Sequence, residues 1–248
     1  MSQPSSDRTD RDRPRSSTLG WWRMNVLAFA SRKGGSGKST LAAQLALHAH
    51  RGLRRCLLVD EDPQGSLTLW NALRQEAALP IKAVKRELAD VLKKAKRRDV
   101  DWVFIDTPAN VSASVVDAIR AARLVIVPCR PGLLDIDAVQ ETIDFSRRLG
   151  TPYAVVLNGA PPKREHIESP VVTAARQCLA ELNVPVWGGQ ITHRVSYSLA
   201  VSRGEGVQEQ ALDAGSCGEI ARLWEAIEKS VHVIRGARER AAMHQVAA

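Results

Sequence analysis

The stretch that decides the fold of this chain is Arg32-Lys33-Gly34-Gly35-Ser36-Gly37-Lys38-Ser39-Thr40, which directly follows the apolar run Asn25–Ser31. The apolar run is typical of a buried parallel strand, and Leu41–His50 has the hydrophobic periodicity of a helix. The glycines therefore lie at a turn from strand to helix, where backbone N–H groups and a helix N-terminus can converge on phosphate oxygens. The segment predicts a phosphate-binding loop.

Two side chains of this loop supply what a nucleoside triphosphate needs. Lys38 can reach the β- and γ-phosphates, and the hydroxyl of Ser39 is placed to ligate Mg²⁺. The loop departs from the usual pattern G-x-x-x-x-G-K-[ST], because Arg32 replaces the first glycine and a second lysine, Lys33, follows it. A glycine-rich turn without a ligand is the alternative interpretation, and the strand-to-helix context argues against it.

The departure from the usual pattern points to a family. The pattern K-G-G-x-G-K-[ST]-[ST] resembles the deviant Walker A motif of the ParA/MinD family of P-loop ATPases. The resemblance implies that ATP and Mg²⁺ are bound by Lys33, Gly34, Gly35, Ser36, Gly37, Lys38, Ser39 and Thr40. It also implies that Lys33 reaches across a two-fold interface to the nucleotide of a partner subunit. Neutralisation of phosphate within its own subunit is the alternative role for Lys33.

Two further apolar runs end in carboxylates. Cys56–Gly65 reads CLLVDEDPQG, and Trp102–Ala109 reads WVFIDTPA. The carboxyl end of a strand is where an open α/β sheet binds its ligand. The resemblance implies that Asp60 and Asp106 support Mg²⁺ and that Asp62 orients the attacking water. Asp60 and Asp62 could instead cap the helix that follows them.

The similarity to the family extends from about Asn25 to Ser230. Leu124–Pro128 predicts another strand, and Tyr153–Leu157 predicts one that ends in Asn158. The family contacts the adenine base from the position of Asn158. A lone asparagine at a strand end is also a common turn former, so the residue type alone leaves its role open.

Length and composition agree with one α/β domain. The 248 residues are 44% hydrophobic, which is enough for one sizeable core. Strands that alternate with helices predict a mostly parallel sheet with helices on both faces. Together with this sheet, the resemblance implies a single-domain P-loop NTPase. We expect the ATPase domain to span residues 24–235. Residues 1–23, rich in Ser, Pro, Asp and Arg, predict a disordered arm, and residues 236–248 a flexible tail.

Several protein classes are disfavoured. No run of eighteen apolar residues predicts a transmembrane helix, and residues 1–23 lack the apolar core of a signal peptide. The four cysteines are scattered, which suits reduced thiols in a cytoplasm and offers no metal site. That spacing also argues against the related nitrogenase iron proteins. We expect a cytoplasmic, nucleoid-associated protein.

The chain is basic, with a formal net charge of +8 and a pI near 9.7. Apolar residues at helical spacing from Ile81 to Ala95 predict an amphipathic helix. Its outer face would carry Lys82, Lys85, Arg86, Lys93, Lys94, Lys96, Arg97 and Arg98. Such a face is either simply solvated or attracts nucleic-acid phosphate in a salt-dependent way.

A second basic group lies in the C-terminal third of the chain. The resemblance implies that DNA is bound there by basic residues that meet across the ATP-bound dimer, and we predict Arg194, Arg203 and Arg222 for this role. Aromatic residues do not interleave with these charges, so base stacking is not indicated and DNA contact should be nonspecific.

The resemblance implies a function closest to that of small ParA-type partition ATPases without an N-terminal helix-turn-helix domain. Such a protein forms an ATP-dependent homodimer, binds DNA nonspecifically, and positions a cargo when a ParB-like or other adaptor stimulates hydrolysis. The alternative is a MinD-like membrane-associated switch, which the alanine-rich tail disfavours. A bacterial tyrosine kinase would need a tyrosine-rich tail, and only Tyr153 and Tyr197 are present.

Overall fold

The structure is a computed structural model that describes residues 24–75, 79–83, 87–110, 112–210 and 213–246. The predicted disordered arm, residues 1–23, lies outside the described residues. The described strands form one parallel sheet in the order β3-β2-β4-β1-β5-β6-β7. The strands are β1 Asn25–Phe29, β2 Cys56–Asp60, β3 Ile81–Ala83, β4 Trp102–Asp106, β5 Leu124–Cys129, β6 Tyr153–Ala160 and β7 Ile191–Thr192. The predicted parallel α/β architecture is confirmed.

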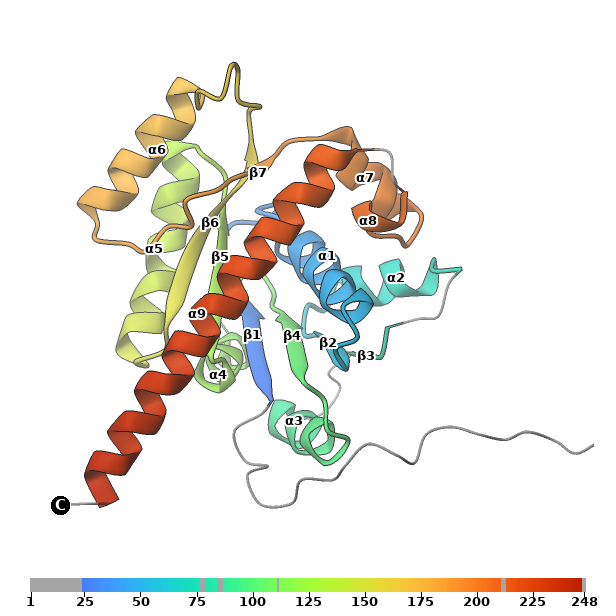
Figure 1. Ribbon diagram of the computed structural model, residues 1–248, viewed down its shortest axis with the longest axis vertical. Coiled ribbons are helices and arrows are strands. Elements are labelled where there is room, and N and C mark those ends of the chain that lie inside the picture. The colour runs from blue at the N-terminus through green and yellow to red at the C-terminus, as the bar shows by residue number, and fades with distance from the viewer. Residues whose placement is uncertain (1–23, 76–78, 84–86, 111, 211–212, 247–248) are drawn as a thin grey trace, which may run out of the picture.

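Helices cover both faces of this sheet (Figure 1). Helices α1, α2, α7, α8 and α9 contribute to the core on one face, and α3, α4, α5 and α6 to the core on the other. Their bounds are α1 Lys38–Arg51, α2 Ser66–Ala72, α3 Leu88–Arg97, α4 Ala113–Ala121, α5 Leu133–Arg148, α6 Pro170–Glu181, α7 Val195–Ser202, α8 Val207–Gln210 and α9 Ala214–Val246. The predicted helices on both faces are therefore confirmed.

The central strand β1 shows why the strand sequences are almost continuously apolar. Successive side chains of a strand point to opposite faces of the sheet. Leu27 and Phe29 accordingly enter the α1 core, whereas Val26 and Ala28 enter the core on the α5 side. Because both faces are covered by helices, neither set can be polar.

Helix α9 crosses the sheet on the α1 side (Figure 1) and fixes the aromatic part of the core. The ring of Trp224 lies 4.7 Å from that of Trp102 and 5.9 Å from that of Phe104, centroid to centroid. The last helix is therefore docked on the core through Trp224. The helix continues past Arg235 to Val246, so no helix end marks the expected start of a tail at residue 236.

The predicted amphipathic helix from Ile81 to Arg98 is wrong in its first part. Ile81–Ala83 form the edge strand β3, which pairs with Leu58–Asp60 of β2. Lys82 is therefore a strand residue, and α3 begins only at Leu88. Lys85 and Arg86 lie outside the described residues. Pairing with β2 is a long-range contact, so helical spacing of apolar residues could not reveal it.

The described cysteines are free thiols, and Cys56 and Cys129 are buried in the cores. This agrees with the expectation of reduced core thiols. Within the described ranges, no helix is both long enough and apolar enough to cross a membrane.

Candidate nucleotide-binding site

Three strand ends meet at the carboxyl edge of the sheet. In the parallel register, Asp106 at the end of β4 lies beside Phe29 of β1 on one side and Asp60 of β2 on the other. The phosphate-binding loop, Arg32–Gly37, starts three residues after Phe29. The sheet thus brings the loop and the two carboxylates together, as predicted for a site at the carboxyl ends of parallel strands.

The loop needs glycine at two positions for backbone reasons. Gly35 has a φ of +71° and Gly37 a φ of +99°, which is the left-handed region that other residues rarely adopt. A Cβ on Gly37 would lie only 2.1 Å from Nδ2 of Asn158. Helix α1 begins immediately afterwards, at Lys38, so its unpaired N–H groups face the loop.

Lys38 is buried at the start of α1 and folds back over the loop. Its ammonium donates hydrogen bonds to the carbonyls of Ser31 at 3.1 Å and of Lys33 at 3.5 Å. Burial lowers the pKa of Lys38, and the carboxylates of Asp106 and Asp62 oppose that shift. The ammonium therefore lies among the groups that would surround a bound triphosphate.

Asp106 is fully buried, and neither of its carboxylate oxygens makes a hydrogen bond of normal geometry with a described residue. Burial raises its pKa to about 7, and the nearby hydroxyl of Ser39 works in the opposite direction. An unpaired carboxylate facing a hydroxyl fits a hard cation with oxygen ligands. Among the described residues no group of three or more His, Cys, Asp or Glu could hold a metal by itself. The donor set thus suits Mg²⁺, which keeps waters and phosphate oxygens as ligands.

Asp60 and Asp62 have different environments. Oδ2 of Asp60 accepts hydrogen bonds from the backbone N–H of Thr68 at 2.8 Å and from its hydroxyl at 2.7 Å. Asp60 therefore binds the first turn of α2, the capping role that the residues alone left open, while its Oδ1 has no partner among the described residues. Asp62 is partly exposed, and its Oδ1 accepts from the N–H of Gln64 at 3.0 Å.

A cavity of about 500 Å³ joins the loop to the segment after β2. It lies at the carboxyl edge of the sheet. Its lining residues are Gly34, Gly35, Gly37, Lys38, Ser39, Thr40, Ala43, Asp62, Gln64, Ser66, Leu67, Trp70, Ala109 and Val201. A larger cavity elsewhere in the molecule contains no part of the loop, so we assign the nucleotide to this one.

Asn158 and Arg130 flank the other side of the loop. The side-chain amide of Asn158 donates to the carbonyl of Ser36 at 2.7 Å, so this residue supports the loop; its predicted contact with adenine stays a prediction. Arg130, at the end of β5, places Nη2 3.8 Å from the Cβ position of Gly35. Arg130 is not among the site residues predicted from the sequence. Its position directly after a buried strand was the available signal.

The three arginines predicted to contact DNA differ in their surroundings. Arg203 and Arg222 are exposed. The guanidinium of Arg194 lies 3.4 Å from a carboxylate oxygen of Asp213 and 3.2 Å from one of Glu219. Arg194 thus ties the end of β7 to α9, and its charge is already compensated.

Known proteins resemble this chain in sequence and in fold. The profile of the CobQ/CobB/MinD/ParA nucleotide binding domain matches residues 27–207. Protein ParA of Rhizobium radiobacter is 34% identical over 189 residues, which cover 71% of this chain and 81% of that protein. Maintenance of carboxysome distribution protein A of Gloeobacter kilaueensis is 32% identical over 167 residues, which cover 65% and 74%.

A solved structure shows the same fold. The septum site-determining protein MinD of Pyrococcus horikoshii, complexed with Mg-ADP, matches with a TM-score of 0.65 at 18% identity. The match covers 85% of this chain and 98% of that one.

Proposed function

We propose that this chain, which belongs to the CobQ/CobB/MinD/ParA family of nucleotide-binding domains, is an ATPase that partitions or positions a cargo along DNA. The observation that carries the proposal is the convergence of Lys38, Asp62 and the unpaired Asp106 on the phosphate-binding loop. A relative named for carboxysome distribution matches 65% of this chain, and one named for chromosome partitioning matches 46% of it.

Hydrolysis of ATP needs positioning, charge neutralisation and a water in line with the γ-phosphate. Lys38 and the loop N–H groups would hold the β- and γ-phosphates, and Thr40 lines the same cavity. Ser39, Asp106 and the free oxygen of Asp60 would hold Mg²⁺, which neutralises phosphate charge when bound. Asp62 is the carboxylate that shares the open cavity with the loop, so it would orient the water.

The ATP-bound state would be a dimer that uses the loop face. Lys33 has no ion-pair partner among the described residues, whereas its neighbour Arg32 pairs with Glu141 of α5. Lys33 is therefore the loop cation available to a partner's nucleotide. Leu133 and Leu134, at the start of α5, are 75% and 74% exposed beside this face. Leucines this exposed suit burial against a second copy.

DNA would be bound through the exposed Arg203 and Arg222, with Arg194 as a structural support for β7 and α9. Contacts of this kind go to phosphates and carry no sequence information. Hydrolysis, stimulated by a ParB-like or other adaptor, would separate the dimer and release DNA. A switch that depends on the γ-phosphate is a common device of this kind.

The experiment is a binding assay of the purified protein on arbitrary-sequence duplex DNA with ATP, with ADP and without nucleotide, over rising salt. We expect binding only with ATP, and affinity that falls steeply with salt because counterions are released. Lys38→Ala should abolish ATP binding. Asp62→Ala should keep ATP binding, lower hydrolysis by about 100-fold or more, and remain on DNA.

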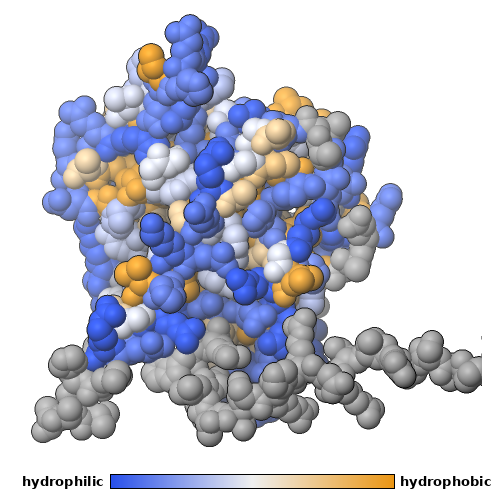
Figure 2. Space-filling model, viewed as in Figure 1, coloured by the Kyte–Doolittle hydropathy of each residue, from blue (hydrophilic) through white to orange (hydrophobic). Residues whose placement is uncertain are grey.

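Phosphatidylglycerol vesicles are the competing surface in that assay. ATP-dependent binding to vesicles without binding to DNA would replace the proposal by the MinD-like membrane switch. On the face shown in Figure 2, apolar surface occurs in small patches separated by hydrophilic side chains, which gives no broad area for a bilayer.

A further inference from the structure

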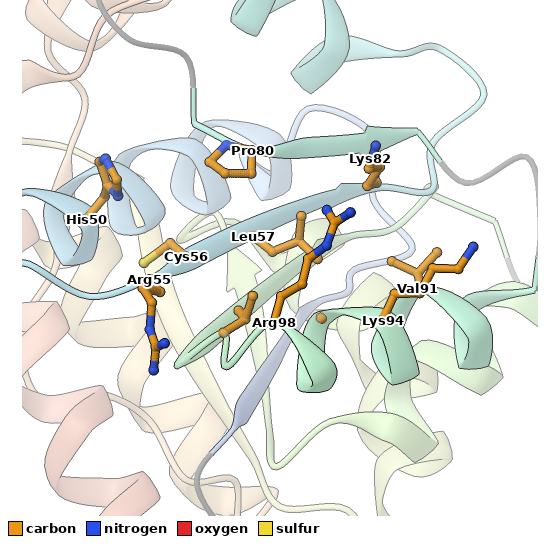
Figure 3. Close-up of a pocket in the computed structure, with 11 residues that line it drawn as sticks. His50, Arg55, Cys56, Leu57, Pro80, Lys82, Val91, Lys94 and Arg98 are labelled. Atoms are coloured by element: carbon orange, nitrogen blue, oxygen red, sulfur yellow. The ribbon is translucent and has the colours of Figure 1, made fainter. Parts of the chain in front are cut away.

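A second cavity, larger than the one at the nucleotide site, is remote from that site. It has a volume of about 720 Å³ and lies between α3 and the β2–β3 edge of the sheet (Figure 3). Arg55 and Cys56 at the start of β2, and Val100 just before β4, line it. It therefore opens at the amino ends of the strands, whereas the phosphate-binding loop follows the carboxyl end of β1.

The walls of this cavity are aliphatic. Leu57 and Ala95 are buried at 7% and 3% exposure, and Val91, Val100 and Pro80 complete the apolar lining. No Phe, Tyr or Trp lines the cavity, and His50 is the one aromatic side chain among the lining residues. Walls of this composition bury an alkyl chain well and offer little stacking to a nucleobase.

The mouth of the cavity is cationic. Lys82, Lys94 and Arg98 stand around Leu57 and Val91 (Figure 3). These three have no ion-pair partner among the described residues, and no Asp or Glu lines the cavity.

Arg55, at the other end of the cavity, is different, because Asp101 holds it at 3.3 Å and Asp99 at 3.9 Å. Charge is therefore left uncompensated at one end of the cavity, above its aliphatic floor. An occupant that matches both features carries its negative charge at one end and an apolar body behind it.

We infer that this cavity binds an anionic amphiphile, an aliphatic chain that ends in a carboxylate or phosphate. The chain would lie on Leu57, Val91 and Ala95, and the head would meet Lys82, Lys94 and Arg98. A free fatty acid and an anionic membrane lipid share this chemistry. Burial raises the pKa of the Cys56 thiol to about 12, so this lining residue stays protonated and the binding is noncovalent.

Calorimetric titration with octanoate, decanoate and dodecanoate below their micelle concentrations tests the inference. Each buried methylene contributes about 0.8 kcal/mol, so affinity should rise about fourfold per methylene along the series. Absence of binding, or equal affinity for the three acids, would overturn the inference.

Two neighbouring arginines at the end of α3 give a matched pair of variants. Arg98 lines the cavity, and Arg97 is also exposed but does not line it. Arg98→Glu should weaken dodecanoate binding at least tenfold, and Arg97→Glu should change it less than twofold. Equal weakening by both would mean general attraction of anions to a basic helix, and would contradict a site. ATP binding, measured in parallel, should be unchanged in both variants.

The cavity itself can be filled. Ala95→Trp should abolish dodecanoate binding while circular dichroism and ATP binding show a folded protein. If this variant does not fold, the arginine pair still decides the question.

Sedimentation with phosphatidylglycerol vesicles then separates the two sources of the amphiphile. Dodecanoate binding without sedimentation assigns the cavity to a free acid. Sedimentation that Arg98→Glu abolishes and Arg97→Glu preserves assigns it to a bilayer lipid.

Discussion

Asp106 combines full burial with two carboxylate oxygens that make no normal hydrogen bond to a described residue. A buried charge without partners destabilises the folded state unless something neutralises it. We propose that in this site a cation held together with Ser39 supplies that neutralisation. Asp106 should therefore destabilise the protein without a cation and favour binding of a cation.

Asp106→Asn should make the nucleotide-free protein more stable near pH 8. The folded pKa of Asp106 is about 7, above its ordinary value of 3.8, so the folded state binds the extra proton between these values. Stability then falls as pH rises from about 4 to 7 and is constant above that. We expect the free energy of unfolding of Asp106→Asn to exceed that of the wild type by about 2–4 kcal/mol near pH 8.

Urea unfolding of both proteins from pH 4 to 8 without Mg²⁺ checks this. Burial also raises the pKa of Glu61 to about 7, so the stability of the variant should still fall with pH, with a smaller slope than that of the wild type. An identical slope in wild type and variant would contradict the assignment. Loss of ATP hydrolysis in Asp106→Asn should accompany the gain in stability.

Arg130 is the second residue whose position suggests a role. Its exposed guanidinium lies next to Gly35 of the loop and has no partner among the described residues. Hydrogen bonds to charged groups contribute roughly 1.5–3 kcal/mol, and exposure places this one at the low end.

We expect Arg130→Ala to weaken ATP binding about tenfold, as measured with a fluorescent ATP analogue. Arg148→Ala, at the opposite end of α5, is the control for loss of one positive charge and should bind ATP normally. Normal binding by both variants would remove Arg130 from the site.

At the scale of elements, the segment after α2 is bound to α8 by a buried ion pair and to the loop between α7 and α8 by a hydrogen bond. Arg74 and Glu209 lie 2.9 Å apart with side chains only 3% and 8% exposed, and Arg74 also donates to the carbonyl of Gly204 at 2.8 Å. Burial opposes ionisation of Glu209, but hydrogen bonds from Arg74 and from the backbone of Gly206 outweigh it and lower its pKa. The helices that precede these contacts, α2 and α7, line the nucleotide cavity through Trp70 and Val201.

Breaking this pair from one side should destabilise the protein by about 3–5 kcal/mol, because the remaining charge stays buried. Glu209→Gln and Arg74→Met each test this in thermal unfolding. The double variant should be less destabilised than the sum of the single ones. The stabilisation by ionised Glu209 is present above pH 4.5 and is lost on acidification through its lowered pKa, so Glu209→Gln should flatten the acid limb of the stability curve. Additive single effects would show that the two charges are not coupled.

The elements that carry the motifs could be predicted from sequence for a physical reason. β1, β2 and β4 are short apolar runs bounded by polar turns. β2 and β4 end in Asp60 and Asp106, and β1 is followed within a few residues by the phosphate-binding loop. Local signals of this kind survive without tertiary information.

What the sequence could not reveal depends on long-range contacts. β3 exists because Ile81–Ala83 pair with β2, and the charge of Arg194 is compensated because Asp213 and Glu219 reach it. The support of the loop by Asn158 likewise needs β6 to lie near β1. Each of these is set by packing between distant segments, which residue type alone does not encode.

At the scale of the whole molecule, two sites lie at opposite ends of one sheet. The nucleotide cavity follows the carboxyl ends of β1 and β2, and the aliphatic cavity lies at the amino end of β2. A nucleotide-dependent dimer would use the first end and leave the second accessible.

Leu134→Glu should prevent dimer formation without preventing ATP binding. The side chain is 74% exposed beside the loop face, so the substitution places a charge in the expected interface at little cost to the monomer. We expect ATP-dependent dimerisation of the hydrolysis-deficient Asp62→Ala protein to weaken by more than about tenfold in the double variant. Sedimentation velocity with ATP measures it, and Leu53→Glu, exposed after α1 on the other end of the sheet, is the control.

The order of strands in the sheet has a consequence for how the chain is made. β1 is synthesised first but lies in the middle, where its neighbours are β4 and β5; Leu27, for example, pairs with Leu124. On the ribosome this apolar strand has no partners until β4 and β5 are made, and the side of the Trp102 and Phe104 rings that Trp224 covers stays open until α9 is made. Nascent chains with such late pairing fold slowly and attract chaperones. A chain interrupted before Ala214 would lack α9 and leave that aromatic cluster open to aggregation.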